Sequence, residues 1–303
     1  MIYLEKIFKS INYDYNLLIK NINLLCQRYP FLRKKSIGKS VRGRDIPSIT
    51  LGNSDNYCLF AAAVHGSEHI TSNVILMWLE ELCQSITDGT SFCGLKIQET
   101  IMERGIIVVP RVNPDGCEIS IHGANACGKY IKEITRMSKG DFLHFNANFR
   151  GVDINHNFDA GWEELKKKEE NMGIHFPSST RFGGYKKMSE PETLALTNLC
   201  KTENIRNAIA LHSQGKVIYW TYGNNRPKSS RQIAEIMAKT SGYALDVAFG
   251  IADGGGFKDW FIKEFNRPAF TVELGLGENP LPIETANDIY DEVKKMFTIT
   301  SIL

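Results

Sequence analysis

The 303-residue sequence lacks a long hydrophobic run and an excess of charge of either sign. No uninterrupted apolar stretch approaches the roughly 20 residues that a membrane-spanning helix needs. Lys and Arg total 36 against 34 Asp and Glu, so the formal charge is only +2. This balance gives no electrostatic sign of binding to nucleic acid or to an acidic membrane surface. We therefore expect no nucleic acid and no membrane as partners, and the oligomeric state stays open.

The sequence also lacks a CxxC pair, and its first residues do not predict a secretory signal. The seven cysteines are scattered and none forms a CxxC pair, which argues against a zinc ribbon and a thioredoxin-type redox motif. The first residues mix charge and polarity too early for a secretory signal. Free thiols are typical of a reducing compartment, so we expect a cytoplasmic protein.

Internal repeats, low-complexity tracts and linker-like segments are absent as well, which predicts one domain over residues 1–303, with a helical lead-in over 1–35. Strands alternating with helices indicate an α/β sandwich with a largely buried central sheet. The weakly periodic stretch 117–150 is expected to be loop and short helix, and such segments are often functional. Apolar runs predict strands at 57–64, 106–109, 208–211, 217–220 and 269–273, and helical spacing predicts helices at 13–28, 69–86, 189–203, 228–240, 257–265 and 282–297.

Two histidines and a glutamate follow predicted buried strands. His65 and Glu68 lie three residues apart, so a helical turn brings both side chains toward one metal ion. Each of these residues taken alone is weak evidence, because a lone histidine at a strand end is more often a satisfied residue near the core. His212 completes a set of two histidines and one glutamate, which leaves a fourth position open for water and is typical of catalytic zinc.

A further carboxylate, Glu273, ends an apolar run and is costly to bury without a partner. If its strand delivers the side chain to the same end of the sheet, Glu273 can act as a general base toward water activated by the metal.

The order and spacing of several strings resemble the zinc carboxypeptidase superfamily over about residues 10–295. That resemblance implies a single-domain, three-layer α/β/α sandwich with a mixed central sheet. In chain order, the strings are Ile37-Gly-Lys-Ser-Val-Arg-Gly-Arg44, His65-x-x-Glu68, Asn113-Pro-Asp-Gly116, Gly151-Val-Asp-Ile-Asn155, Ser189-Glu-Pro-Glu192, His212-Ser213 and Glu273.

Within the superfamily, the sequence is most similar to bacterial γ-D-glutamyl-diamino-acid peptidases, which cut peptidoglycan stem peptides. The strings that carry this similarity are Asn148-Phe-Arg-Gly-Val-Asp-Ile-Asn155, Phe158-Asp-Ala-Gly-Trp162 and Phe182-Gly-Gly-Tyr185.

The resemblance assigns a role to each matching position. It implies one Zn²⁺ ion held by His65, Glu68 and His212, with Glu273 taking the water proton and delivering it to the leaving amine. A cis peptide bond is implied between residues 213 and 214, just after the last histidine ligand.

Two further positions carry alternatives. Asp153 is expected to orient the first histidine ligand, although a buried salt bridge would also explain it. Arg150 is a candidate to stabilise the oxyanion, with a surface salt bridge as the alternative.

The sequence departs from digestive carboxypeptidases at His156, where those enzymes have an arginine that clamps the terminal carboxylate of the substrate. An imidazole fits a carboxylate less well than a bidentate guanidinium. We therefore predict that Asn155, His156 and Arg181 bind the substrate, although a solvated basic loop is the commoner explanation for a residue such as Arg181.

The predicted activity is hydrolysis of the γ-D-glutamyl–diaminopimelate bond of a stem peptide. One alternative is a conventional carboxypeptidase that removes a C-terminal residue. Another is a non-catalytic peptide-binding relative, against which the retained Glu273 argues.

Overall fold

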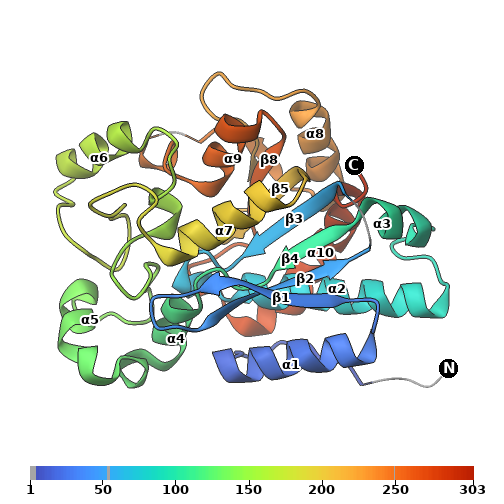
Figure 1. Cartoon of the computed structure of the whole chain (residues 1–303), viewed down its shortest axis with the longest axis horizontal. Coiled ribbons are helices and arrows are strands. Elements are labelled where there is room, and N and C mark those ends of the chain that lie inside the picture. Colours follow the sequence, from blue (N-terminus) through green and yellow to red (C-terminus); the bar gives the residue numbers. More distant parts are fainter. Residues whose placement is uncertain (1–4, 53–54, 249) are drawn as a thin grey trace.

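A mixed sheet of eight strands runs through the part of the chain that the computed structural model describes, residues 5–52, 55–248 and 250–303. The strands lie in the order β1-β2-β4-β3-β5-β8-β6-β7 (Figure 1). The central strands β4, β3, β5 and β8 are parallel, whereas β2 and β6 join them antiparallel at either side. The strands are β1 (Arg33–Lys39), β2 (Asp45–Leu51), β3 (Tyr57–Ala62), β4 (Ile106–Val109), β5 (Ile205–His212), β6 (Val217–Tyr219), β7 (Ala244–Asp246) and β8 (Ala269–Glu273).

Helices cover both faces of this sheet, and none of the described helices is long and apolar enough to cross a membrane. Short 3₁₀ turns connect several of them. The α-helices are α1 (Tyr15–Arg28), α2 (Ile70–Asp88), α3 (Gln98–Arg104), α4 (Pro114–His122), α5 (Ile131–Ser138), α6 (Trp162–Asn171), α7 (Pro191–Thr202), α8 (Ser230–Ser241), α9 (Phe257–Phe265) and α10 (Ala286–Thr300).

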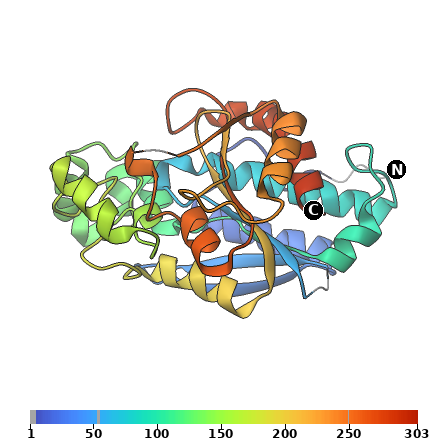
Figure 2. The same cartoon turned by 90° about the horizontal axis from the view of Figure 1, so that it is seen from above.

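The alternation of side chains along β3 divides the core into two layers. Cys58 and Phe60 face a cluster that includes residues of α1, α2, α8 and α10, whereas Leu59 and Ala61 face a second cluster that includes residues of α7 and α9. Figure 2 shows α7 and α10 on opposite sides of the sheet. The structure thus confirms a three-layer α/β/α sandwich around a mixed, buried sheet.

Every strand and helix predicted from apolar patterning is present, with ends shifted by a few residues. Strands β1, β2 and β7 and helices α3 and α6 were not predicted. β1 is rich in Lys and Arg and mostly exposed at the sheet edge, so it shows no apolar alternation. The expected helical lead-in contains α1 but runs into β1, and the stretch 117–150 holds short helices as expected.

Candidate active site

The carboxyl ends of β3, β5 and β8 lie side by side in the sheet and carry the predicted functional residues. His65 follows β3, His212 is the last residue of β5 and Glu273 is the last residue of β8. His212 and Glu273 are direct register partners, so their side chains point to the same face of the sheet. That face is the one covered by α7 and α9.

A tight turn brings Glu68 back beside His65. The turn is a 3₁₀ segment, Gly66–Glu68, which leads into α2. At Gly66, an added Cβ would lie 2.3 Å from the carbonyl oxygen of Phe145 and 2.5 Å from the backbone of Gly116. Only glycine permits this close packing, so the segments around 116 and 145 set the position of the turn.

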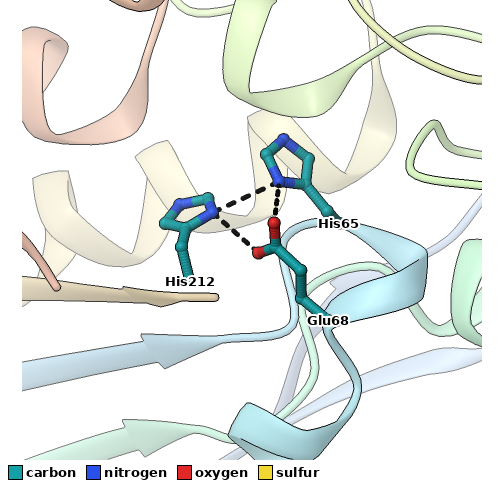
Figure 3. Close-up of side chains that lie close together, drawn as sticks. All are labelled: His65, Glu68 and His212. Atoms are coloured by element: carbon teal, nitrogen blue, oxygen red, sulfur yellow. Dashed lines mark hydrogen bonds and ion pairs between the residues drawn. The ribbon is translucent and has the colours of Figure 1, made fainter. Parts of the chain in front are cut away.

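His65, Glu68 and His212 converge on one point (Figure 3). The two Nδ1 atoms lie 3.3 Å apart, and each lies 2.9 Å from an oxygen of Glu68. A tetrahedral ion with ligands at roughly 2.0–2.1 Å places pairs of ligand atoms about 3.3 Å apart. Two imidazole nitrogens and a carboxylate are also the donor types that zinc prefers. The three residues can therefore hold a zinc ion.

The electrostatics of this cluster favour a positive charge at its centre. Burial alone would raise the pKa of Glu68, but the two neighbouring imidazoles lower it to about 2, so this carboxylate is ionised. Burial also opposes protonation of His65, yet the carboxylates of Glu68 and Asp153 raise the pKa of His65 well above its usual value. A site that stabilises positive charge in this way suits a bound cation.

Asp153 holds the His65 ring from the side opposite the cluster. Its Oδ1 lies 3.1 Å from Nε2 of His65, while its Oδ2 accepts a hydrogen bond of 2.8 Å from the backbone N–H of Arg181. Burial would raise the pKa of Asp153, but His65 and His156 outweigh it and keep the pKa far below its usual range. An ionised Asp153 accepts a hydrogen bond from a protonated Nε2 of His65, which leaves Nδ1 free for a metal.

Glu273 lies beside the cluster without a hydrogen bond to it among the described contacts. Desolvation, with the neighbouring charge of Glu68, raises the pKa of Glu273 to about 7, although His212 and His65 oppose the rise. A carboxylate with a pKa near neutrality can both accept and release a proton.

A cavity of about 260 Å³ lies next to the cluster, and most of the predicted site residues line it. Two of its walls are the strand β8 and the glycine-rich segment before α9. The predicted residues that line it are His65, Asp153, Asn155, His156, Arg181, His212 and Glu273.

The predicted substrate-binding residues are fixed by contacts behind the cavity wall. Oδ1 of Asn155 accepts a hydrogen bond of 3.0 Å from the first backbone N–H of α9. Nδ1 of His156 lies 2.9 Å from the carbonyl oxygen of Arg181 and 3.3 Å from Glu169, so Nε2 remains available for a ligand. Burial would lower the pKa of His156, but Asp153 and Glu169 raise it overall.

Arg150 lies in a different place. It lines a second cavity of about 320 Å³ together with Arg42, whose guanidinium stacks on the rings of Tyr130 and Phe149. The Arg150 side chain is 55% exposed, and its Nη1 lies 3.4 Å from Glu190. The structure therefore does not bring Arg150 to the His65 cluster, and its role in catalysis stays a prediction.

Several residues of the cavity were not found by sequence reasoning. Tyr219 and Thr271 line it from adjacent strands, and Lys258 and Asp259 line it from the first turn of α9. One signal in the sequence could have found Lys258 and Asp259. These two opposite charges lie within the aromatic string Phe257–Phe261, and they have to be buried if that helix packs on the sheet.

The predicted cis bond is confirmed between Ser213 and Gln214.

The fold and the site together are those of a metallopeptidase. A sequence model of the zinc carboxypeptidase family matches residues 18–298, and the chain belongs to that family. The resemblance seen in the sequence is thereby confirmed.

The relatives agree with this assignment. The chain is 36% identical over 289 residues to a gamma-D-glutamyl-L-diamino acid endopeptidase of Lysinibacillus sphaericus. This match covers 94% of this chain and 71% of that protein. It is 32% identical over 283 residues to an uncharacterised protein of Bacillus subtilis, covering 92% of this chain and 74% of the relative. The crystal structure of a carboxypeptidase A from Helicoverpa armigera superimposes with a TM-score of 0.70 at 19% identity, over 96% of this chain and 73% of the other. This last likeness concerns the fold.

Proposed function

We propose that the protein is a zinc-dependent peptidase that hydrolyses the γ-D-glutamyl–diamino acid bond of peptidoglycan stem peptides. The observation that carries the proposal is the convergence of His65, Glu68 and His212 beside Glu273, next to a cavity that His65, His212 and Glu273 line. The bond itself is suggested by the relative from Lysinibacillus sphaericus, whose name describes that activity.

In this proposal, one zinc ion is held by Nδ1 of His65, Nδ1 of His212 and the carboxylate of Glu68. A bound zinc ion would polarise a substrate carbonyl and lower the pKa of its bound water to about 7. Asp153 keeps the His65 ring in the required orientation and tautomer through the 3.1 Å contact with Nε2.

Glu273 carries the proton in the proposed reaction. Its carboxylate removes a proton from the attacking water, and the same group then delivers that proton to the nitrogen of the leaving amine. A pKa raised to about 7 by desolvation supports both steps, because neither form of the carboxyl group is strongly favoured at neutral pH.

Substrate binding falls to the polar groups on the cavity wall. His156 and Arg181 are the cationic candidates that line the wall near Asp153, and Asn155 adds an amide group. This chain has His156 at the sequence position of the carboxypeptidase clamp, so a terminal carboxylate is gripped less tightly than in a digestive enzyme unless Arg181, on the same cavity wall, takes the place of that arginine. A substrate held by its γ-D-glutamyl portion does not depend on that clamp.

The proposed specificity predicts a large difference between two substrates. We expect kcat/KM for a γ-D-glutamyl-meso-diaminopimelate peptide to exceed that for a hippuryl L-amino acid by at least about 10²-fold, since each 1.4 kcal/mol is about a factor of ten. Steady-state hydrolysis followed by chromatography of the released amine measures both values. Equal rates would assign the protein to the conventional carboxypeptidases instead.

The role of Arg150 has its own test. If its guanidinium stabilises the oxyanion, Arg150→Ala should lower kcat by about 10²-fold with little change in KM. Arg42→Ala is the matched control, because Arg42 lines the same second cavity. A change below about threefold in kcat for Arg150→Ala would leave Arg150 a surface residue paired with Glu190.

We further propose that the protein acts in the cytoplasm. All seven cysteines are free, which suits a reducing compartment. Cell fractionation with an antibody to the chain checks this expectation.

A further inference from the structure

Glu169 of α6 is a buried acidic residue that has no part in the mechanism above. Its exposed fraction is 0%, and it contacts His156, which lines the cavity beside the metal cluster. Burying a carboxylate is costly unless the group is paired or hydrogen-bonded. The place of Glu169 behind a predicted substrate-binding residue therefore requires a physical explanation.

Both carboxylate oxygens of Glu169 face N–H donors. Oε1 accepts a hydrogen bond of 2.9 Å from the backbone N–H of Gly183 and lies 3.3 Å from Nδ1 of His156. Oε2 accepts a hydrogen bond from Nζ of Lys166, one turn earlier on the same helix. This arrangement suits an ionised carboxylate, which only accepts hydrogen bonds. Glu169 thus brings a negative charge to the imidazole of His156.

Close packing fixes Glu169 in this place. An added Cβ at Gly183 would lie 2.5 Å from the carbonyl oxygen of His156 and 2.9 Å from Oε1 of Glu169, so only glycine permits the approach of these segments. From the first residue of α6, Nε1 of Trp162 donates a hydrogen bond of 3.0 Å to the carbonyl oxygen of Gly183. The helix is therefore docked on the backbone at 183, and its carboxylate is held beside the imidazole.

The contacts of His156 determine which nitrogen faces a ligand. Nδ1 lies 2.9 Å from the carbonyl oxygen of Arg181, and a carbonyl oxygen only accepts, so Nδ1 carries a hydrogen. Among the described residues, Nε2 has no hydrogen-bond partner. A neutral His156 offers only the lone pair of Nε2 to the cavity, which repels a carboxylate. A protonated His156 offers a charged N–H donor there.

The charges around His156 favour the protonated form. Burial lowers the pKa of His156, but the carboxylates of Asp153 and Glu169 raise it above its ordinary value overall. Asp153 already contacts His65 and the backbone N–H of Arg181, whereas Glu169 contacts His156 directly. The titratable and charged residues that surround His156 in the described structure are Asp153, Glu169, Lys166 and Arg181, together with Glu273, Lys258 and Asp259 of the same cavity lining.

Resting on the proposed function, we propose that Glu169 is a positioning residue that keeps Nε2 of His156 protonated and directed at a carboxylate of the bound peptide. Glu169 does not touch the substrate and acts only through the imidazole. The chain then has a cation where digestive carboxypeptidases have an arginine, but the charge of this cation depends on pH. Binding of the carboxylate should therefore weaken as the pH rises through the pKa of His156.

The first experiment titrates His156 by NMR in the wild type and in Glu169→Gln, with His156→Gln used to assign its signals. The glutamine keeps the size of the side chain and an acceptor for Gly183, but it carries no charge. We expect the pKa of His156 to lie above 6.5 in the wild type. It should fall by about one pH unit or more in the variant, because an opposite charge at this distance has an effect of that size.

Glu170→Gln is the matched control, since Glu170 is the next residue of the same helix and is exposed. This substitution should leave the pKa of His156 unchanged. An unchanged pKa in Glu169→Gln as well would overturn the proposal.

The second experiment compares γ-D-glutamyl-meso-diaminopimelate with the same peptide amidated at the α-carboxylate of diaminopimelate. At pH 7, the wild type should bind the acid with a KM about 10-fold lower than that of the amide. In Glu169→Gln, this difference should shrink below about threefold while kcat stays within about threefold of the wild type. At pH 6 the variant should regain the difference, because its His156 is protonated again. A structural defect would instead weaken both peptides at either pH.

Lys166→Met separates the charge of Glu169 from the docking of α6. It removes the ammonium group that pairs with Oε2 but leaves the carboxylate beside His156, so the preference for the acid should persist. Loss of the preference in this variant would assign Glu169 and Lys166 a docking role only. Should Glu169→Gln fail to fold, the wild type decides the matter, because a His156 that titrates at or below 6.5 contradicts the proposal.

The outcomes also separate this proposal from the proposed function. If Glu169→Gln raises KM for both peptides equally, the inference fails and the γ-D-glutamyl peptidase stands. If neither peptide is cleaved by the wild type, the proposed function has failed, and the NMR titration still decides whether Glu169 sets the charge of His156.

Discussion

Replacing Glu273 with glutamine is expected to lower kcat by about 10²-fold or more while metal content stays unchanged. The amide keeps the size of the side chain and its place at the end of β8, opposite His212, but it cannot accept the proton of the attacking water. The measurement is steady-state hydrolysis of the γ-D-glutamyl peptide, together with the zinc content of the purified variant.

Glu278→Gln serves as the control for this variant. Glu278 is exposed and lies five residues further along the chain, so its substitution should leave kcat and metal content as in the wild type. Turnover of Glu273→Gln within about threefold of the wild type would remove Glu273 from the proton transfer. Loss of zinc in the variant would instead show that Glu273 contributes to holding the metal.

The central elements of the fold were predictable because their sequences carry one unambiguous physical signal. β3 and β4 are buried on both faces, which requires continuous apolar runs, and such runs are visible in the sequence. The signal is absent where a strand has water on one side and few neighbours. β1 is therefore detectable only through its pairing with β2, which a local reading of the sequence does not contain.

The candidate site divides in the same way. His65 and His212 were predictable because each lies at the end of an apolar run, and parallel strands deliver their carboxyl ends to one edge of the sheet. Residues that reach the cavity from helices were not predictable, because α9 packs on the sheet through contacts distant in sequence. The sequence of α9 therefore does not show that Lys258 lines the cavity. The contact of His156 with Glu169 depends on α6, which was not predicted.

Replacing His212 with alanine is expected to abolish metal binding and to lower activity by at least about 10³-fold, since the proposed chemistry depends on the ion. The substitution removes one of three donors and leaves only His65 and Glu68, three residues apart, to hold a cation. Metal analysis should find about one zinc ion per wild-type chain and almost none in the variant.

A second readout separates lost metal binding from a damaged fold. A ligand that binds only the folded state stabilises it by RT ln(1 + [L]/Kd), which is about 2.7 kcal/mol at 100 times Kd. Added zinc should therefore raise the Tm of the metal-stripped wild type and of the control His122→Ala, whose histidine is exposed, but not that of His212→Ala. If zinc raises the Tm of all three proteins alike, the ion is held elsewhere and the assignment of His65, Glu68 and His212 as its ligands is wrong.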